Sequence, residues 1–158
     1  TGTVHAIGAG IVICEIQQSS TCTYRLYDFN RKDKFGDPRE LHIDKALDVM
    51  NFSKYCPEKI DEGAINAEGY TKRTISLCKY FECALLEIDS SARILGVEES
   101  FTSFLCIEGR GSINVRRQNE PDTVVETLEF NAGDSLFAPK STDIFEMTGE
   151  CKMIVTRV

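Results

Sequence analysis

The chain has 158 residues, which is the usual size of one domain. Hydrophobic residues make up 42% of it and charged residues 27%, so it can bury a core and is not a disordered tail. Eighteen Lys and Arg against 25 Asp and Glu give a net charge of −7. Because an acidic surface repels phosphate backbones and anionic lipids, we expect no nucleic-acid partner and no membrane partner. The longest apolar stretch, residues 6–14, is shorter than the roughly 20 residues of a membrane-spanning helix.

The cysteines and the start of the chain both bear on where the protein works. The seven cysteines contain no C-x-x-C pair, which argues against a zinc site made of thiolates. Cys83 and Cys106 lie in apolar, alternating runs, so we expect buried thiols and a reducing, cytoplasmic setting. The chain begins with Thr and has no signal-peptide pattern, and we interpret it as a fragment of a longer protein.

The first third of the chain combines strand, loop and helix patterns. Residues 11–16 form a β-branched apolar run and residues 24–29 alternate in polarity, so both favour strands. Residues 30–40 are charged, contain Gly36 and Pro38, and predict a loop.

One amphipathic helix is expected after this loop. Apolar residues recur at helical spacing, at Ile43, Ala46, Leu47 and Met50. The N-terminal cap of this helix is weak. Pro57 would end any continuation of the helix, and residues 54–74 have the pattern of an irregular connector.

From residue 75 onward the hydrophobic period is two. Alternation places Phe81, Cys83 and Leu85 on one face of a strand. The further expected features are strands at 101–107, 113–117, 124–130, 136–138 and 153–158, turns at 109–111 and 133–134, and a polar hairpin loop at 118–122. Short strands between turn signals predict a mainly β fold, a sandwich or jelly roll.

Few residues in the chain could carry chemistry. Of the two histidines, His42 lies near the helix start and is interpreted as a surface or capping residue, whereas His5 is either structural or a metal ligand. On strands, Glu15 and Gln17 would share a face, as would Arg25 and Tyr27. Such a polar face is either solvated, with an Arg–Asp pair, or the wall of a cavity that binds a hydroxylated, phosphorylated ligand with Arg25 as its cation.

The segments GTVHAIGAGIVICEIQQSS and TYRLYDFNRKDKFGDPRELHIDKAL closely resemble the class I-type mannose-6-phosphate isomerases, in their short bacterial form. The resemblance is strong over residues 1–50. It implies cupin jelly rolls, one zinc ion per full-length chain, and interconversion of mannose 6-phosphate and fructose 6-phosphate in the cytoplasm. The metal would polarise the substrate carbonyl while an arginine holds an oxyanion or phosphate.

The resemblance also implies domains and residue roles. Residues 1–53 would be the C-terminal part of a metal-binding first cupin plus a helix, with His5 as its last zinc ligand. Arg25 would be the catalytic arginine, and the substrate-binding residues would be Glu15, Gln17 and Tyr27. Residues 75–158 would be a degenerate second cupin, because Ser141 and Ile144 stand where the cupin motif has Gly and His.

Three expectations and two alternative functions also follow from the sequence. With a single candidate ligand, the fragment should bind zinc weakly or not at all, be inactive alone, and self-associate through exposed strand edges. One alternative function is a metal-free cupin that binds sugars or regulates. The other is a different cupin enzyme, such as a sugar epimerase or a metal oxygenase.

Overall fold

The computed structural model describes residues 2–20, 22–54 and 64–158. The chain divides into two compact units, Thr1–Glu58 and Lys59–Val158. The division lies within the predicted connector, whereas Pro57, expected to end the helix, lies outside the described residues. No helix in the described part of the chain is long and apolar enough to cross a membrane.

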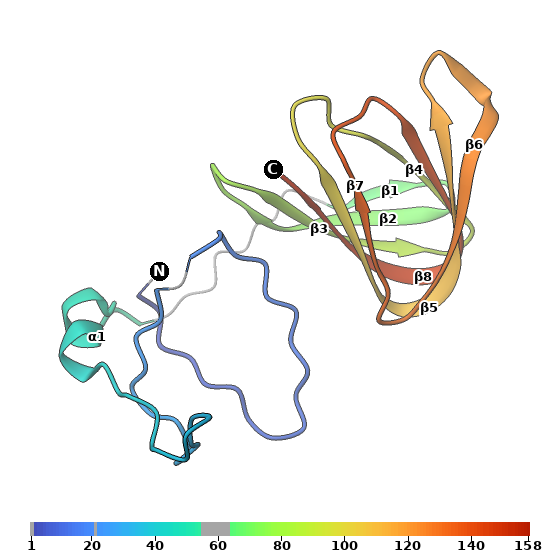
Figure 1. Ribbon diagram of the computed structural model, residues 1–158. Helices are drawn as coiled ribbons and strands as arrows, with labels where there is room; N and C mark the ends of the chain where they lie inside the picture. Colours follow the sequence, from blue (N-terminus) through green and yellow to red (C-terminus); the bar gives the residue numbers. More distant parts are fainter. Residues whose placement is uncertain (1, 21, 55–63) are drawn as a thin grey trace. The chain divides into compact units, whose positions relative to one another are not determined.

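The first unit contains the predicted helix, α1 (Ile43–Val49), shown in Figure 1. No side chain caps its start at His42, which confirms the weak cap, and the chain becomes extended at Met50. Of its apolar face, Ala46 is buried while Leu47 remains about half exposed.

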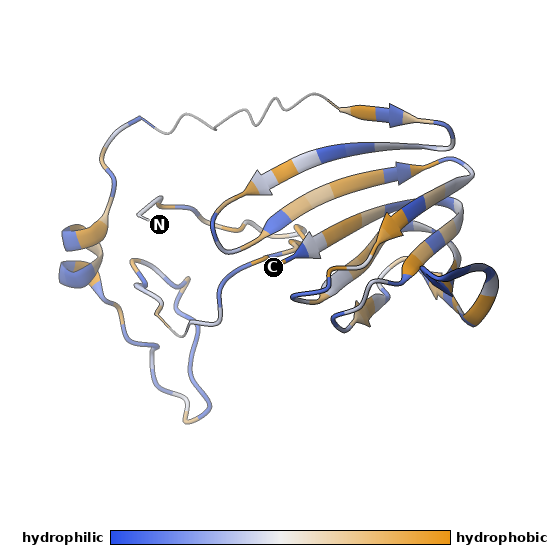
Figure 2. Ribbon diagram, turned by 90° about the horizontal axis from the view of Figure 1, so that it is seen from above, coloured by the Kyte–Doolittle hydropathy of each residue, from blue (hydrophilic) through white to orange (hydrophobic). Residues whose placement is uncertain are grey.

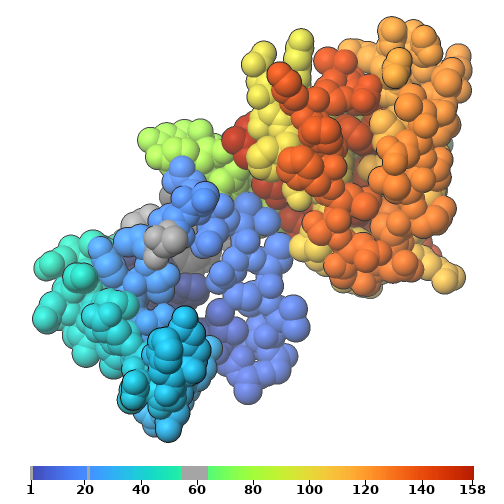
Figure 3. All heavy atoms as spheres, in the orientation of Figure 1, coloured from blue at the N-terminus to red at the C-terminus, as the bar shows by residue number. Residues whose placement is uncertain are grey.

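The strands predicted at residues 11–16 and 24–29 were wrong. The described residues of the first unit contain a single β-bridge, between Lys32 and Pro38, and no strand. A β-branched run has the propensity for a strand, but a strand becomes stable only through the hydrogen bonds and side-chain packing of a neighbour. The apolar run is accordingly exposed, with Val12 at 98%. Figure 3 shows the atoms of this unit in blue and cyan.

The second unit is one curled antiparallel sheet (Figure 1). Its order is β1-β2-β3-β8-β5-β6, while β4 also pairs with β8, and β7 with β5. The long strands β5 and β8 pair along most of their length and each has further partners on its other side, which curls the sheet around a core. The strands are β1 (Ile65–Ala67), β2 (Tyr70–Leu77), β3 (Glu82–Ile88), β4 (Ser91–Leu95), β5 (Thr102–Arg117), β6 (Glu120–Asn131), β7 (Ser135–Ala138) and β8 (Ile144–Arg157).

Alternate residues of these strands form the core, and the hydrophobic positions recur along them in Figure 2. Phe104 on β5 and Phe145 on β8 lie with their ring centroids 5.5 Å apart. Cys83 and Cys106 are buried, as the sequence predicts. The core consists of Ala84, Leu86, Ile88, Ala92, Ile94, Phe104, Cys106, Ile113, Phe130, Ala138, Phe145, Met147, Cys151, Met153 and Val155.

Three details of this unit differ from the prediction. The sheet already begins at β1 and β2, inside the segment expected to be irregular, and β4 was not anticipated. The turn predicted at residues 109–111 is instead a continuous part of β5. A Cβ atom at Gly111 would collide with the carbonyl oxygen of Thr148 on β8, so this glycine permits close approach of two strands. A hairpin turn lies within the loop predicted at 118–122, but it is shorter, because β6 already begins at Glu120, which pairs with Arg117.

Candidate functional site

In the first unit, three arginines surround one buried carboxylate. The Asp28 side chain is 5% exposed, and its Oδ1 accepts hydrogen bonds from Arg31 Nε at 3.0 Å and Arg31 Nη2 at 2.5 Å. Arg39 Nε lies 3.3 Å from Asp28 Oδ2, without hydrogen-bond geometry, and Arg25 Nε lies 3.8 Å from Oδ1. Three positive charges around one negative charge leave an excess of two positive charges, which favours an anionic ligand.

Arg31 is brought to Asp28 by a tight turn. Phe29 and Asn30 both adopt positive φ, at 51° and 54°, and the N–H of Arg31 donates to the carbonyl oxygen of Asp28 at 2.9 Å. This left-handed conformation is costly for a residue such as Phe, and surrounding contacts must hold it in place. The turn brings the Arg31 side chain against the Asp28 carboxylate.

The loop predicted at residues 30–40 is confirmed and places Arg39 beside Arg31. The Asp33 carboxylate accepts from the N–H groups of Phe35 and Asp37, at 2.8 and 3.1 Å. This closes the loop, so that the N–H of Arg39 can donate to the carbonyl oxygen of Arg31 at 3.3 Å.

Arg25 is held from its main chain and from its side chain. The N–H of His42 donates to the carbonyl oxygen of Arg25 at 2.7 Å, and the N–H of Arg25 donates to His42 Nδ1 at 3.2 Å. The guanidinium donates through Nη1 to the carbonyl oxygen of Glu40 at 2.9 Å. His42 was interpreted as a surface or capping residue. It does occupy the N-cap position of α1, where its carbonyl oxygen accepts from the N–H of Ala46 at 2.9 Å. Its side chain, however, is only 20% exposed and bonds to Arg25 rather than to the helix, so a surface or side-chain-capping role was wrong.

The other predicted site residues lie apart from these contacts. His5, Glu15 and Gln17 are exposed, and no hydrogen bond or ion pair of the described residues joins them to Arg25. Since residues 11–16 form no strand, the argument that Glu15 and Gln17 share a strand face does not hold. Tyr27 is exposed and packs edge-on against Phe29, with ring centroids 4.9 Å apart.

Sequence reasoning foresaw Arg25 and an Arg–Asp pair but not the shared carboxylate or the bond from Arg25 to His42. The spacing R-x-x-D-x-x-R is visible in the sequence and could have indicated that Arg25, Asp28 and Arg31 meet. The partnership between residues 25 and 42 has no local signal, because it depends on how the loop closes.

The described residues include no group of three or more His, Cys, Asp or Glu side chains able to hold a metal ion. His5 therefore lacks co-ligands within this part of the chain, and the residues present do not form a zinc site.

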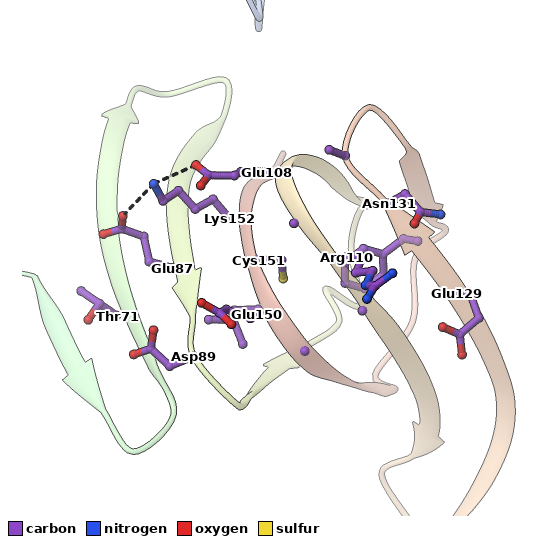
Figure 4. Close-up of a pocket in the computed structure, with 16 residues that line it drawn as sticks. Thr71, Glu87, Asp89, Glu108, Arg110, Glu129, Asn131, Glu150, Cys151 and Lys152 are labelled. Carbon is purple, nitrogen blue, oxygen red and sulfur yellow. Dashed lines mark ion pairs between the residues drawn. The ribbon is translucent and has the colours of Figure 1, made fainter.

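The second unit has a broad hollow of about 1170 Å³ over strands β2, β3, β5, β6 and β8. Figure 4 shows charged side chains along it, with Lys152 between Glu108, at 2.9 Å, and Glu87, at 4.0 Å. The hydrogen bond that Lys152 Nζ donates to the Glu108 carboxylate raises the pKa of Lys152, which keeps the amine protonated. Burial raises the pKa of the Cys151 thiol to about 11, so it is not a ready nucleophile. The hollow thus offers paired charges rather than a reactive group.

Residues 71–158, the greater part of this sheet, match the family described as "Mannose-6-phosphate isomerase, cupin domain". The chain belongs to this family. These residues were predicted to be a cupin only from their expected pattern of strands. The family match confirms the mainly β, cupin fold class.

Curated relatives match along the whole chain. The mannose-6-phosphate isomerase ManA of Bacillus subtilis is 34% identical over 158 residues, which is 100% of this chain and 47% of ManA. The putative mannose-6-phosphate isomerase YvyI of the same organism is 32% identical over the same shares. The crystal structure of the mannose 6-phosphate isomerase from Bacillus subtilis superposes with a TM-score of 0.68 at 30% identity, covering 85% of this chain and 40% of that one. The chain therefore spans about half the length of the curated relatives it matches.

Proposed function

We propose that the chain is part of a zinc-dependent aldose–ketose isomerase that interconverts mannose 6-phosphate and fructose 6-phosphate, and that Arg25 is its catalytic arginine. The observation that carries this proposal is the placement of Arg25, with a side chain 19% exposed, in a cluster of three arginines around Asp28. The names of the relatives support the choice of reaction.

The cluster suits the chemistry of this isomerisation. A proton moves between C1 and C2 of the open-chain sugar through an enediolate, whose oxygen gains negative charge. A guanidinium remains charged throughout and donates several hydrogen bonds in a fixed plane, so Arg25 can stabilise this oxygen or hold the phosphate. The excess positive charge around Asp28 would attract a phosphorylated sugar into an otherwise acidic protein. Glu15, Gln17 and Tyr27 would bind sugar hydroxyls.

His5 would be one ligand of the zinc ion. The described residues do not form a metal site. The other ligands would therefore come from a part of the full-length protein equivalent to the portion of ManA that these 158 residues do not match. By itself the chain would bind zinc weakly, be inactive, and self-associate, which the exposed apolar residues of the first unit support. The buried thiols of Cys106 and Cys151 support a reducing, cytoplasmic setting.

The test is turnover of mannose 6-phosphate by the full-length protein that contains this chain, with and without a chelator. We expect chelator-sensitive activity that falls by about 100-fold or more in Arg25→Ala, the scale of losing a charge-stabilising donor. Arg117→Ala, at an exposed position of β5 in the other unit, is the matched control and should keep its activity.

Full activity in Arg25→Ala would contradict the role of Arg25. A folded, zinc-replete protein without turnover would contradict the isomerase proposal and favour the metal-free, sugar-binding cupin.

A further inference from the structure

The structure assigns to His42 a positioning role: its imidazole holds the main chain of Arg25, so that the guanidinium is presented in one orientation. The two residues are 17 positions apart and are joined by two hydrogen bonds, His42 N–H to Arg25 O at 2.7 Å and Arg25 N–H to His42 Nδ1 at 3.2 Å. The second bond uses the side chain where a neighbouring strand would ordinarily use a carbonyl oxygen. Because residues 24–29 pair with no strand among the residues that the structure describes, the imidazole is the acceptor that satisfies this N–H.

The same short segment also holds the guanidinium. The carbonyl oxygen of Glu40, two residues before His42, accepts from Arg25 Nη1 at 2.9 Å. The carboxylate of Asp28 also lies near the guanidinium, with its Oδ1 3.8 Å from Arg25 Nε. Main chain and side chain of Arg25 are therefore anchored to residues 40–42, which lead directly into α1. Loss of the His42 acceptor would leave the bond from His42 N–H as the remaining main-chain tie between the two residues, so the Arg25 main chain could move and shift both guanidinium contacts.

The side-chain requirement at position 42 is specific. Nδ1 accepts the hydrogen bond from Arg25, so position 42 must supply an acceptor at this atom, while Nε2 lies 3.7 Å from Glu40 Oε2. An Asn side chain can place its Oδ1 close to the position of Nδ1 and accept the same bond. A Leu side chain has similar bulk and no acceptor, and would leave the N–H of a half-buried residue unsatisfied.

The experiment compares His42→Asn and His42→Leu in the full-length protein, and its activity arm depends on the proposed isomerase function. We expect His42→Leu to lower kcat for mannose 6-phosphate by about 10- to 100-fold, the scale of a misplaced catalytic group. His42→Asn should stay within about threefold of the wild-type value, since the acceptor is retained. In an Arg25→Ala background, His42→Leu should cause no further loss, because a positioning residue acts through the residue that it positions.

Amide hydrogen exchange at Arg25 tests the same contact without any turnover. The N–H of Arg25 should be protected in the wild type and in His42→Asn, and should exchange at least about tenfold faster in His42→Leu. If the wild-type protein has no isomerase activity but this exchange pattern holds, the proposed function fails and the positioning contact stands. Equal protection and equal kcat in His42→Leu and wild type would overturn the inference, as would an Asn variant as impaired as the Leu variant.

Discussion

Leu86 lies on β3 at the centre of the sheet's core, and its side chain is fully buried. Replacing it with alanine removes three carbon atoms from this core. At about 0.8 kcal/mol for each buried methylene, the lost transfer free energy is about 2.4 kcal/mol. The cavity left among rigid strands adds to this, so we expect Leu86→Ala to lower the free energy of unfolding by about 3–4 kcal/mol.

The assay is urea unfolding at 25 °C followed by far-UV circular dichroism, since the chain contains no Trp to report on the core by fluorescence. With a urea dependence of about 2 kcal/mol per molar, a loss of 3–4 kcal/mol lowers the midpoint by about 1.5–2 M. Because the m-value reports the surface exposed on unfolding, it should stay unchanged if the variant keeps the same sheet.

Leu95→Ala is the matched control. Leu95 lies on β4 of the same sheet, but 56% of it is exposed, so the same deletion should change the free energy of unfolding by at most about 0.5 kcal/mol. A loss of less than about 1 kcal/mol in Leu86→Ala would refute the assignment of Leu86 to a tightly packed core. If Leu86→Ala does not fold, Leu86→Val should still show a loss of about 1 kcal/mol, and no loss there would refute the same reasoning.

Two further predictions concern charge and thiol chemistry in the sheet. Hydrogen bonds from Arg93, with those from Arg116, lower the pKa of Glu146 below its ordinary value of 4.5, so this carboxylate stabilises the fold above that pH and the benefit is lost as the pH falls. Glu146→Gln should therefore lower the urea midpoint at pH 7, and the difference from the wild type should shrink toward zero as the pH falls well below 4.5; an unchanged difference down to pH 3 would contradict this. Burial raises the pKa of Cys151 to about 11, so its thiol should resist alkylation by iodoacetamide in the native protein at pH 8, whereas the exposed Cys78 should react. Mass spectrometry of the labelled peptides measures both reactions, and equal labelling of the two cysteines would contradict the prediction.

Much of the second unit could be predicted from local pattern. Alternation at residues 80–86 predicted a strand, and β3 formed there from Glu82, with Ala84, Leu86 and Ile88 in the core and the neighbouring Cys83 also buried. The strand predicted at residues 124–130 became part of β6, in which Phe130 is the buried residue. The helix α1 and the turn at Gly133 could also be predicted from local sequence, because helical spacing and a positive φ depend on a few neighbouring residues.

The candidate site was predictable only in part. The T-Y-R segment singled out Arg25, because a family motif is a string of residues and needs no coordinates. The acceptor role of His42 was missed, since a histidine beside a helix start has several common roles and its partner lies 17 residues away. The roles of His5, Glu15, Gln17 and Tyr27 stay predictions.

The sequence by itself determined the class of fold, the periods of its elements and the family resemblance, because propensity, alternation and motif are written in consecutive residues. Tertiary structure alone decided which segments found partners. Residues 11–16 have the composition of a strand and form none, while Gly109 and Gly111 resemble a turn and lie inside β5. In each case tertiary contacts decide the outcome. Residues 11–16 pair with no strand among the described residues, and the carbonyl oxygen of Thr148 on β8 lies too close to Gly111 for a side chain there.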